Sequence, residues 1–285
     1  MNLKLFLAAL VVVPALAVAA PFPDANYMNY DANGNPIPNQ TNDGTPDVYQ
    51  AINRVIGSNT YGSNADVMGL FTEPDYQWEI TDPDAEIVLI GMTAGYTNTI
   101  GYYQQDANGT INQTALLSAG DHFGWLNDGT QADPYSNVAS LNLPIGSEFG
   151  WYLDVNTQGH GNDDVNPELT YYSEPSLNPE VIIDGESMEE GMDHMMTFNL
   201  DEAAGQTVWV QGQDDAQARM LTLQSAYLLC WEDLYQNHPD WADYDYDDMM
   251  YVVAQVRPTQ VPEPALLSLL GISFLGLAWM RKAKK

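Results

Sequence analysis

The chain has 285 residues, of which 39 are acidic and 8 are basic, so its formal net charge at pH 7 is −31. Residues 20–260 contain three basic residues against 38 acidic ones, a formal charge of −35. A surface with this charge repels nucleic acid, anionic lipid and acidic polysaccharide unless a divalent cation intervenes. The composition therefore excludes a nucleic-acid-binding function.

Residues 1–19 have the pattern of a signal peptide. Lys4 supplies a positive charge, residues 5–16 form an apolar run, and Ala17 and Ala19 are the small residues of a signal peptidase site. The alternative is a buried or membrane-spanning helix, but this run is shorter than the ~20 residues that cross a bilayer. We predict cleavage after Ala19.

Residues 20–60 are predicted to be a leader rich in Asn, Asp and Pro that ends in one short helix. Within residues 46–56, Val48, Ala51, Ile52 and Val55 recur at helical spacing, and Pro46 suits a first helical turn. This segment precedes the main domain, which we expect to span residues 61–260.

The main domain is predicted to be all-β. Residues 148–156 alternate, with Phe149, Trp151, Leu153 and Val155 on one face, as in a half-buried strand. Further strands are expected at residues 86–92, 96–104, 194–200, 207–211, 221–231 and 249–256. Several short strands joined by polar turns favour an antiparallel β-sandwich or a jelly-roll-like fold.

The C-terminal residues 261–285 contain three features in a fixed order. Val261, Pro262, Glu263 and Pro264 precede an uncharged stretch at residues 265–280, which is followed by four basic residues at 281, 282, 284 and 285. A helix over 265–280 covers ~24 Å, slightly less than a hydrocarbon core of ~30 Å, and snorkelling basic side chains extend its reach. The basic cluster stays cytoplasmic by the positive-inside rule, which places the acidic body outside.

These residues resemble the PEP-CTERM sorting signal of Gram-negative bacteria. The resemblance implies recognition by an exosortase, a transient stay in the inner membrane, cleavage near residues 262–264, and transfer of the body to the cell surface or extracellular matrix. An ordinary C-terminal anchor is the alternative, but it would not account for the Pro-Glu-Pro triplet.

Cys230 is the only cysteine, so no intramolecular disulfide stabilises the chain. It lies in the apolar run 226–231, which favours a buried packing thiol over a nucleophile. The domain must then be held together by its core, by bound metal, or by both.

A candidate calcium site lies near the C-terminal end of the domain. An extended backbone at residues 243–248 would project alternate aspartates to one side, and a returning strand would bring residues 232 and 233 close to them. Calcium takes six to eight oxygen ligands and would relieve the repulsion between the carboxylates. The alternative is a solvated acidic hairpin within a generally acidic coat. The predicted ligands are Glu232, Asp233, Asp243, Asp245, Asp247 and Asp248.

A weaker second candidate comprises Asn39, Thr41, Asp43 and Asp47. Oxygen-bearing side chains at alternate positions followed by Asp-Gly are similar to the opening of an EF-hand loop, but Gln50 stands where the closing glutamate belongs. Asp43 as a turn residue and Asp47 near a helix start explain much of this pattern without metal.

The segments 45–53, 193–196, 231–234 and 245–250 resemble an uncharacterised family of exported bacterial proteins that carry this sorting signal and end in an Asp-rich strand motif. The resemblance implies an extracellular β-sandwich with candidate calcium sites and no established enzymatic activity.

No catalytic motif stands out. None of the four histidines, at positions 122, 160, 194 and 238, has a tight zinc-ligand spacing, and no Gly-x-Ser-x-Gly segment occurs. We therefore expect a non-enzymatic surface or matrix protein, stabilised by Ca²⁺ and associated with envelope or biofilm polysaccharide. The alternatives are a secreted carbohydrate-active enzyme on a β-sandwich and a structural coat protein without ligand. Signal peptidase and an exosortase are the expected processing partners.

Overall fold

The computed structural model describes most of the acidic body. The described residues are 22, 28–41, 46–120, 124–125, 137–156, 169–178, 180–183, 186–189, 191–201, 204–205, 207–210, 219–234 and 243–259. They belong to one compact unit, Ala20–Thr259. The signal peptide and the helix predicted at 265–280 lie outside them. Within the described ranges, no helix is long and apolar enough to cross a membrane.

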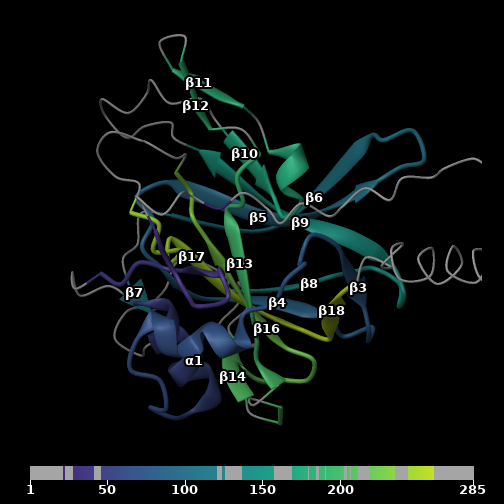
Figure 1. Cartoon of the computed structure of the whole chain (residues 1–285). Coiled ribbons are helices and arrows are strands. Elements are labelled where there is room, and N and C mark those ends of the chain that lie inside the picture. The colour runs from purple at the N-terminus through teal and green to yellow at the C-terminus, as the bar shows by residue number, and fades with distance from the viewer. Residues whose placement is uncertain are drawn as a thin grey trace, which may run out of the picture. The chain divides into compact units, whose positions relative to one another are not determined.

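Two six-stranded antiparallel sheets form the body (Figure 1). The first sheet has the order β18 (Val256–Pro258), β3 (Trp78–Ile80), β9 (Glu148–Asn156), β5 (Thr97–Gln105) and β6 (Ile111–Gly120), with β10 (Leu169–Tyr172) also paired to β9. The second has the order β13 (Met195–Asn199), β16 (Tyr227–Trp231), β17 (Met249–Ala254), β4 (Glu86–Met92) and β7 (Gly124–Trp125), with β8 (Val138–Ser140) also paired to β4. The prediction of an antiparallel, mostly β protein is confirmed.

Smaller elements surround these sheets. Three two-stranded ribbons are formed by β1 (Asn29–Tyr30) with β2 (Pro36–Ile37), β11 (Val181–Ile183) with β12 (Glu186–Glu189), and β14 (Thr207–Val210) with β15 (Arg219–Thr222). The described helical elements are α1 (Val48–Ile56) and two 3₁₀ helices, η1 (Asn64–Leu70) and η3 (Pro175–Leu177).

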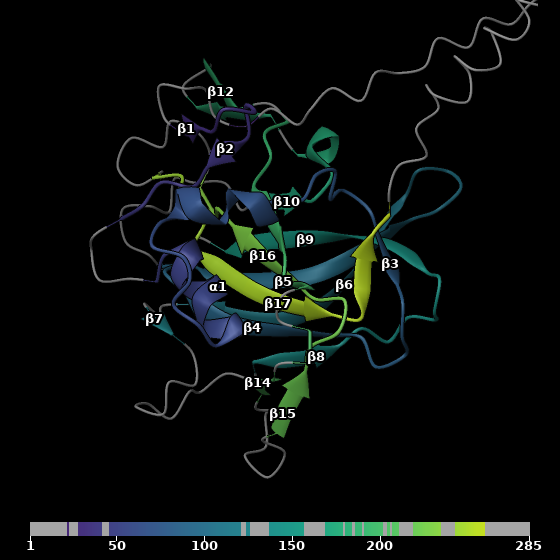
Figure 2. The same cartoon turned by 60° about the horizontal axis from the view of Figure 1, so that its bottom comes forward.

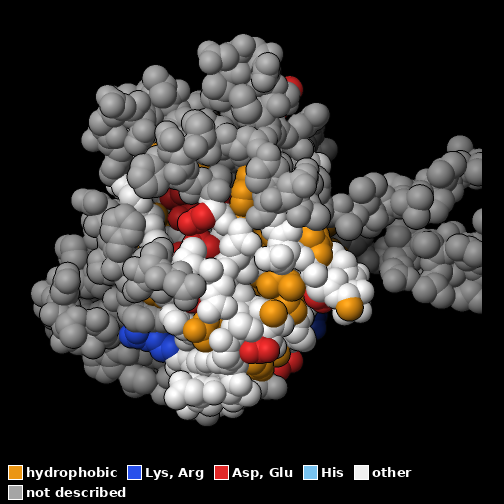
Figure 3. Space-filling model, turned by 60° about the vertical axis from the view of Figure 1, so that its left-hand side comes forward, with side chains coloured by type: hydrophobic (Ala, Val, Ile, Leu, Met, Phe, Trp, Pro, Cys, Tyr) orange, Lys and Arg blue, Asp and Glu red, His pale blue; other side chains and the backbone are white. Residues whose placement is uncertain are grey.

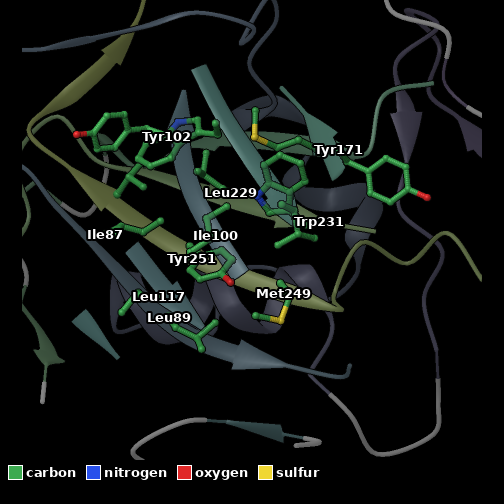
Figure 4. Packing of buried hydrophobic residues seen from close by; sticks show 14 of the residues in the cluster. Ile87, Leu89, Ile100, Tyr102, Leu117, Tyr171, Leu229, Trp231, Met249 and Tyr251 are labelled. Atoms are coloured by element: carbon green, nitrogen blue, oxygen red, sulfur yellow. The ribbon is translucent and has the colours of Figure 1, made fainter. Parts of the chain in front are cut away.

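The main core lies between the two sheets (Figure 4). Trp151 and Leu153 of β9 and Trp231 of β16 are all fully buried members of this core. The alternation predicted for residues 148–156 is confirmed, because its apolar face enters this core. Burying one large apolar side chain contributes roughly 1.5–3 kcal/mol, so the shared core accounts for the packing of the two sheets.

A third layer covers the other face of the second sheet. Strand β17 is buried along its whole length: Tyr251 belongs to the core between the sheets, whereas its neighbour Val252 belongs to a second core. Val48 and Ile52 of α1 pack in this second core, and Figure 2 shows α1 beside β4 and β17. The arrangement of two packed sheets supports the prediction of a β-sandwich. The prediction that this sandwich is jelly-roll-like stays a prediction.

Two expected strands are each divided in the structure. Residues 221–231 contain the end of β15 and the whole of β16, separated by a turn in which Ser225 has φ of 45°. Residues 249–256 bend at Gln255, which has φ of 63°, so β17 lies in the second sheet and β18 in the first. The amide of Gln255 donates to the carbonyl oxygens of Gln224, at 2.9 Å, and Ser225, at 3.2 Å. The two turns therefore stabilise each other, a tertiary effect that the apolar runs do not indicate.

The helix begins at Val48, two residues later than predicted, and Asp47 is its N-cap. The side-chain oxygen of Gln50 accepts a hydrogen bond of 3.3 Å from the Asp47 amide, as in a capping box. Gly57 ends the helix with φ of 67°, a conformation that favours glycine. Cys230 is a free, fully buried thiol, as predicted.

Candidate metal centre

Strand pairing brings the two acidic segments of the predicted site to one end of the second sheet. Trp231, the last residue of β16, lies opposite Met249, the first residue of β17. Glu232 and Asp233 follow β16 directly, and residues 243–248 lead into β17. The expected proximity of these segments is a consequence of the antiparallel register.

The acidic segment is not extended, in contrast to the prediction. Tyr244 and Tyr246 have φ of 56° and 57°, in the left-handed region, and both side chains are buried in the second core. The carboxylate of Asp245 accepts a hydrogen bond of 3.1 Å from the amide of Asp247, which closes a local turn. Burial of the two tyrosines replaces the expected strand with a turned loop.

Glu232, Asp243 and Asp245 form a group that can hold one cation. One carboxylate oxygen of each lies within 4.8 Å of the others. Calcium binds oxygens at about 2.3–2.6 Å, so ligands of one ion can lie up to roughly 5 Å apart. Among the described residues, neither carboxylate oxygen of Glu232 has a hydrogen-bond partner, although this side chain is 0% exposed. A buried carboxylate without hydrogen bonds is costly unless it carries a proton or binds a cation.

Asp233 and Asp248, two of the predicted ligands, make hydrogen bonds instead of joining this group. The Oδ2 of Asp233 accepts from Nδ2 of Asn98 at 2.6 Å, which links the second sheet to β5 of the first. The Oδ2 of Asp248 accepts from the amide of Asp233 at 2.8 Å. Asp247, a further predicted ligand, is fully buried beside them. These three predicted ligands are therefore not members of the group formed by Glu232, Asp243 and Asp245.

The pKa values of the site carboxyls are shifted upward. Burial, followed by the charges of Asp243 and Asp245, raises the pKa of Glu232 well above its ordinary value. Burial, followed by the charges of Asp247 and Asp243, does the same to the pKa of Asp245. The cluster therefore holds its protons more tightly than free carboxyls do, and a divalent cation that displaced them would remove the same repulsion.

The surface view shows acidic side chains gathered on one face of the body (Figure 3). Within the candidate group, Asp243 is exposed, whereas Glu232 and Asp245 are buried. A cation would thus reach the cluster through Asp243 and become enclosed by the two deeper carboxylates.

The described residues of the second predicted site, Asn39, Thr41 and Asp47, make hydrogen bonds within the protein. Nδ2 of Asn39 donates to the carbonyl oxygen of Asp243 at 2.6 Å, and the Asn39 amide donates to that of Tyr244 at 3.0 Å. Asp47 Oδ1 accepts from the amide of Thr41 at 3.2 Å, at the start of α1. Asp43 lies outside the described residues. Asn39 thereby holds the acidic loop of the first site.

The structure contains a second group of carboxylates that no sequence pattern predicts: Glu73, Asp75 and Asp193, whose ligand atoms lie within 4.8 Å of one another. Asp193 precedes β13, and its neighbour His194 lies beside the first group: His194 Nδ1 donates to the carbonyl oxygen of Glu232 at 3.0 Å. The His194 ring stacks on Tyr171 with centroids 3.5 Å apart. The segment 193–196 contributes to the resemblance to exported bacterial proteins, but nothing in the sequence connects it to residues 73–75.

Comparison with known proteins gives one match. No curated protein and no solved structure matches the chain. The match is to the PEP-CTERM protein-sorting motif at residues 260–282, which includes Val261, Pro262, Glu263 and Pro264 and lies outside the described residues. The protein therefore carries a PEP-CTERM sorting signal, which makes it an exported protein that passes through the membrane to the cell surface and is processed by an exosortase-type enzyme.

Proposed function

We propose that the protein is a non-enzymatic component of the cell surface or extracellular matrix whose acidic loop binds calcium. The observation that carries the proposal is the Glu232 carboxylate, which is 0% exposed and lies within reach of Asp243 and Asp245. Outside the cell, millimolar calcium would bind these three carboxylates and hold the loop at residues 243–248 against the end of β16.

The depth of Glu232 also supports ion binding more than glycoside hydrolysis at this group. A hydrolase needs a carboxylic acid that touches the glycosidic oxygen and a second carboxylate that faces the sugar ring. With 0% of Glu232 exposed, a bare ion can meet this carboxylate, whereas a polysaccharide would have to displace the loop. This geometry favours a structural cation over the enzymatic alternative.

The test is the melting temperature of the purified full-length chain, in detergent, with calcium and with chelator. A ligand that binds only the folded state stabilises it by about 2.7 kcal/mol at 100 times its Kd. We expect calcium to raise the melting temperature by several degrees at ~150 mM NaCl, which screens non-specific binding to the acidic surface. Equal melting temperatures in calcium and in chelator would contradict the proposal that the acidic loop binds calcium.

The variant Glu232→Gln tests the position of the ion. Glutamine retains the size of the side chain and removes its charge, so the metal-free chain should be at least as stable as the wild type. The stabilisation by calcium should shrink. The matched control Asp84→Asn neutralises an exposed acidic residue in the turn before β4 and should leave the calcium response unchanged.

A pocket beside α1 supports the proposed contact with polysaccharide. It is an open depression with a volume of about 640 Å³, lined by Tyr49, Gln50, Asn53, Arg54, Gly57, Ser58, Asn59 and Tyr61. Tyrosine rings and amide groups are suited to sugar rings and their hydroxyl groups. The Asn53 side chain bonds both the carbonyl and the amide of Tyr61, at 2.7 and 3.1 Å, which makes the pocket wall rigid.

Retention of the protein on an immobilised envelope polysaccharide tests this contact. We expect Asn59→Ala and Tyr49→Ala to weaken retention without changing the calcium response, because both residues line the pocket and neither belongs to the acidic group. Retention that is unaffected by both variants would place the polysaccharide contact elsewhere.

A further inference from the structure

We propose that Glu73, Asp75 and Asp193 form a second divalent-cation site, separate from the group at Glu232. Their ligand atoms lie within 4.8 Å of one another, close enough for one ion with oxygen ligands at about 2.3–2.6 Å. The two sites share no ligand, so this proposal is independent of the calcium function assigned to the first.

The loop that carries Glu73 and Asp75 is held in place on both sides. The amide of Thr72 donates to the carbonyl oxygen of Thr197 in β13 at 2.9 Å. The indole nitrogen of Trp78 donates to the carbonyl oxygen of Asp75 at 2.6 Å. The loop thus presents its carboxylates against the start of β13 before any ligand binds, which lowers the entropic cost of forming the site.

The carboxylate of Asp75 is the deepest part of this cluster. Asp75 is 0% exposed, and neither of its carboxylate oxygens has a hydrogen-bond partner in the described part of the chain. Apolar burial of a carboxylate without hydrogen bonds is among the costliest arrangements in a protein, and it persists where a proton or a metal ion compensates for it.

Asp193 is fixed by two hydrogen bonds that leave one of its carboxylate oxygens unused. Its Oδ1 accepts from the amide of Met195 at 3.0 Å, and its carbonyl oxygen accepts from the Tyr246 hydroxyl at 2.8 Å. Its Oδ2 is buried and makes no hydrogen bond with the described residues. Asp193 therefore offers one buried oxygen to the cluster while its orientation is fixed.

A side chain outside the acidic group provides an independent indication of a ligand. The hydroxyl group of Thr197, a fully buried residue of β13, also has no hydrogen-bond partner among the described residues. Burial raises the pKa of Asp75, and a weaker interaction with the side chain of Thr197, too long for a regular hydrogen bond, opposes that rise and places the hydroxyl group beside the Asp75 carboxylate. A bound ion would satisfy this uncharged oxygen as well as the carboxylates.

The charges around the cluster favour a cation with oxygen ligands. After burial, the charges of Asp75, Glu73 and Glu174 each raise the pKa of Asp193. Carboxylate and hydroxyl oxygens are the ligands of calcium and magnesium, whereas the softer metals prefer sulfur and imidazole. Glu73 is exposed, so the ion has access to the two buried aspartates from solvent.

The number of calcium ions bound by the purified full-length chain tests this proposal. Calorimetric titration with CaCl₂ at ~150 mM NaCl, after removal of metal with chelator, should show about two strong sites per chain, since screening suppresses loose binding to the acidic surface. Asp75→Asn should retain only the site at Glu232, and Glu232→Gln should retain only the site at Asp75. The control Asp84→Asn should retain both.

Failure of this proposal and failure of the proposed function give different results. If Asp75→Asn binds as many ions as the wild type, the second site does not exist, whatever Glu232→Gln does. If Glu232→Gln binds as many calcium ions as the wild type while Asp75→Asn binds fewer, the second site is supported and the first is contradicted. A wild-type chain that binds no calcium overturns both.

A milder variant addresses a failure of Asp75→Asn to fold. Glu73 is exposed, so Glu73→Gln should leave the fold intact while it weakens the second site by at least tenfold, because it removes one charged ligand. Terbium luminescence, excited through the aromatic side chains, provides a second readout of the same loss. Unchanged calcium and terbium affinity in Glu73→Gln would also overturn the proposal.

Discussion

The hydroxyl group of Tyr246 donates a hydrogen bond of 2.8 Å to the main-chain oxygen of Asp193. This bond joins the two acidic groups, because Tyr246 follows Asp245 of the first group and Asp193 belongs to the second. Tyr246 is fully buried with φ of 57°, so its side chain anchors a backbone conformation that an isolated acidic loop would rarely adopt. This hydrogen bond thus links the positions of the two acidic groups.

We predict that Tyr246→Phe lowers the free energy of unfolding by about 1–3 kcal/mol, because it leaves a buried carbonyl oxygen without its donor. Calcium affinity at the Glu232 group should also fall, since the loop is less firmly held. Urea unfolding in chelator and calorimetric titration measure the two effects. Tyr102→Phe removes a hydroxyl group from the other sheet and is the control; equal losses in both variants would contradict the assigned role of Tyr246.

Asn98 is predicted to stabilise the join between the two sheets. Asn98→Ala removes the donor to Asp233 and should cost about 1.5–3 kcal/mol, the range for a hydrogen bond to a charged group. It should also raise the pKa of Asp233, because burial already raises that pKa to about 6 and the Asn98 side chain opposes the rise. Urea unfolding at pH 7 measures the loss. Asn112→Ala, at an exposed position of β6, should cost much less.

The metal-free protein should become less stable as the pH rises from about 4 to 7. Burial raises the pKa of Asp75 from 3.8 to about 7, so the folded chain retains a proton that the unfolded chain has lost throughout this interval. Stability falls with pH wherever the folded state binds more protons. Melting temperatures in chelator should follow this slope, and Asp75→Asn should flatten it. A slope identical in the variant would show that other groups cause it.

Calcium binding should release protons from the Glu232 group. Glu232 and Asp245 have raised pKa values and must lose their protons before they bind a cation. The heat of binding should therefore differ between two buffers with different heats of ionisation. A heat that is the same in both buffers would mean that the site carboxyls are already ionised.

Cys230 should be unreactive in the folded protein. The thiol is fully buried, and burial followed by the charges of Asp247 and Asp245 raises its pKa well above the ordinary value. A thiol reagent should modify it only after denaturation, because the thiolate is the reactive form. Rapid reaction under native conditions would show that the end of the second sheet opens readily.

The strands were predictable where local pattern decides them. Residues 148–156 alternate because one face of β9 meets the core between the sheets, and β4 coincides with the predicted 86–92. The predictions were wrong where two segments far apart in sequence shape each other. The bend at Gln255 depends on carbonyl groups of residues 224 and 225, and a run of apolar residues contains no sign of them.

The candidate site was predictable in part for the same reason. Glu232 and Asp245 lie at the ends of two strands that follow one another along the chain, so an antiparallel hairpin brings them together. The placement of Asp243 and Asp245 depends on two buried tyrosines with positive φ, which alternation of polar residues does not indicate.

The sequence by itself determined export, the acidic surface, the sorting signal and most of the strands, because short contiguous segments carry these properties. The tertiary structure alone decided that α1 covers the second sheet and that Asp75 meets Asp193. Among the described residues, it also left both carboxylate oxygens of Asp75 and Oδ2 of Asp193 buried without a hydrogen bond. These outcomes depend on packing between segments distant in the chain, where burial and the charge of each neighbour, rather than residue type, set the chemistry of a carboxylate.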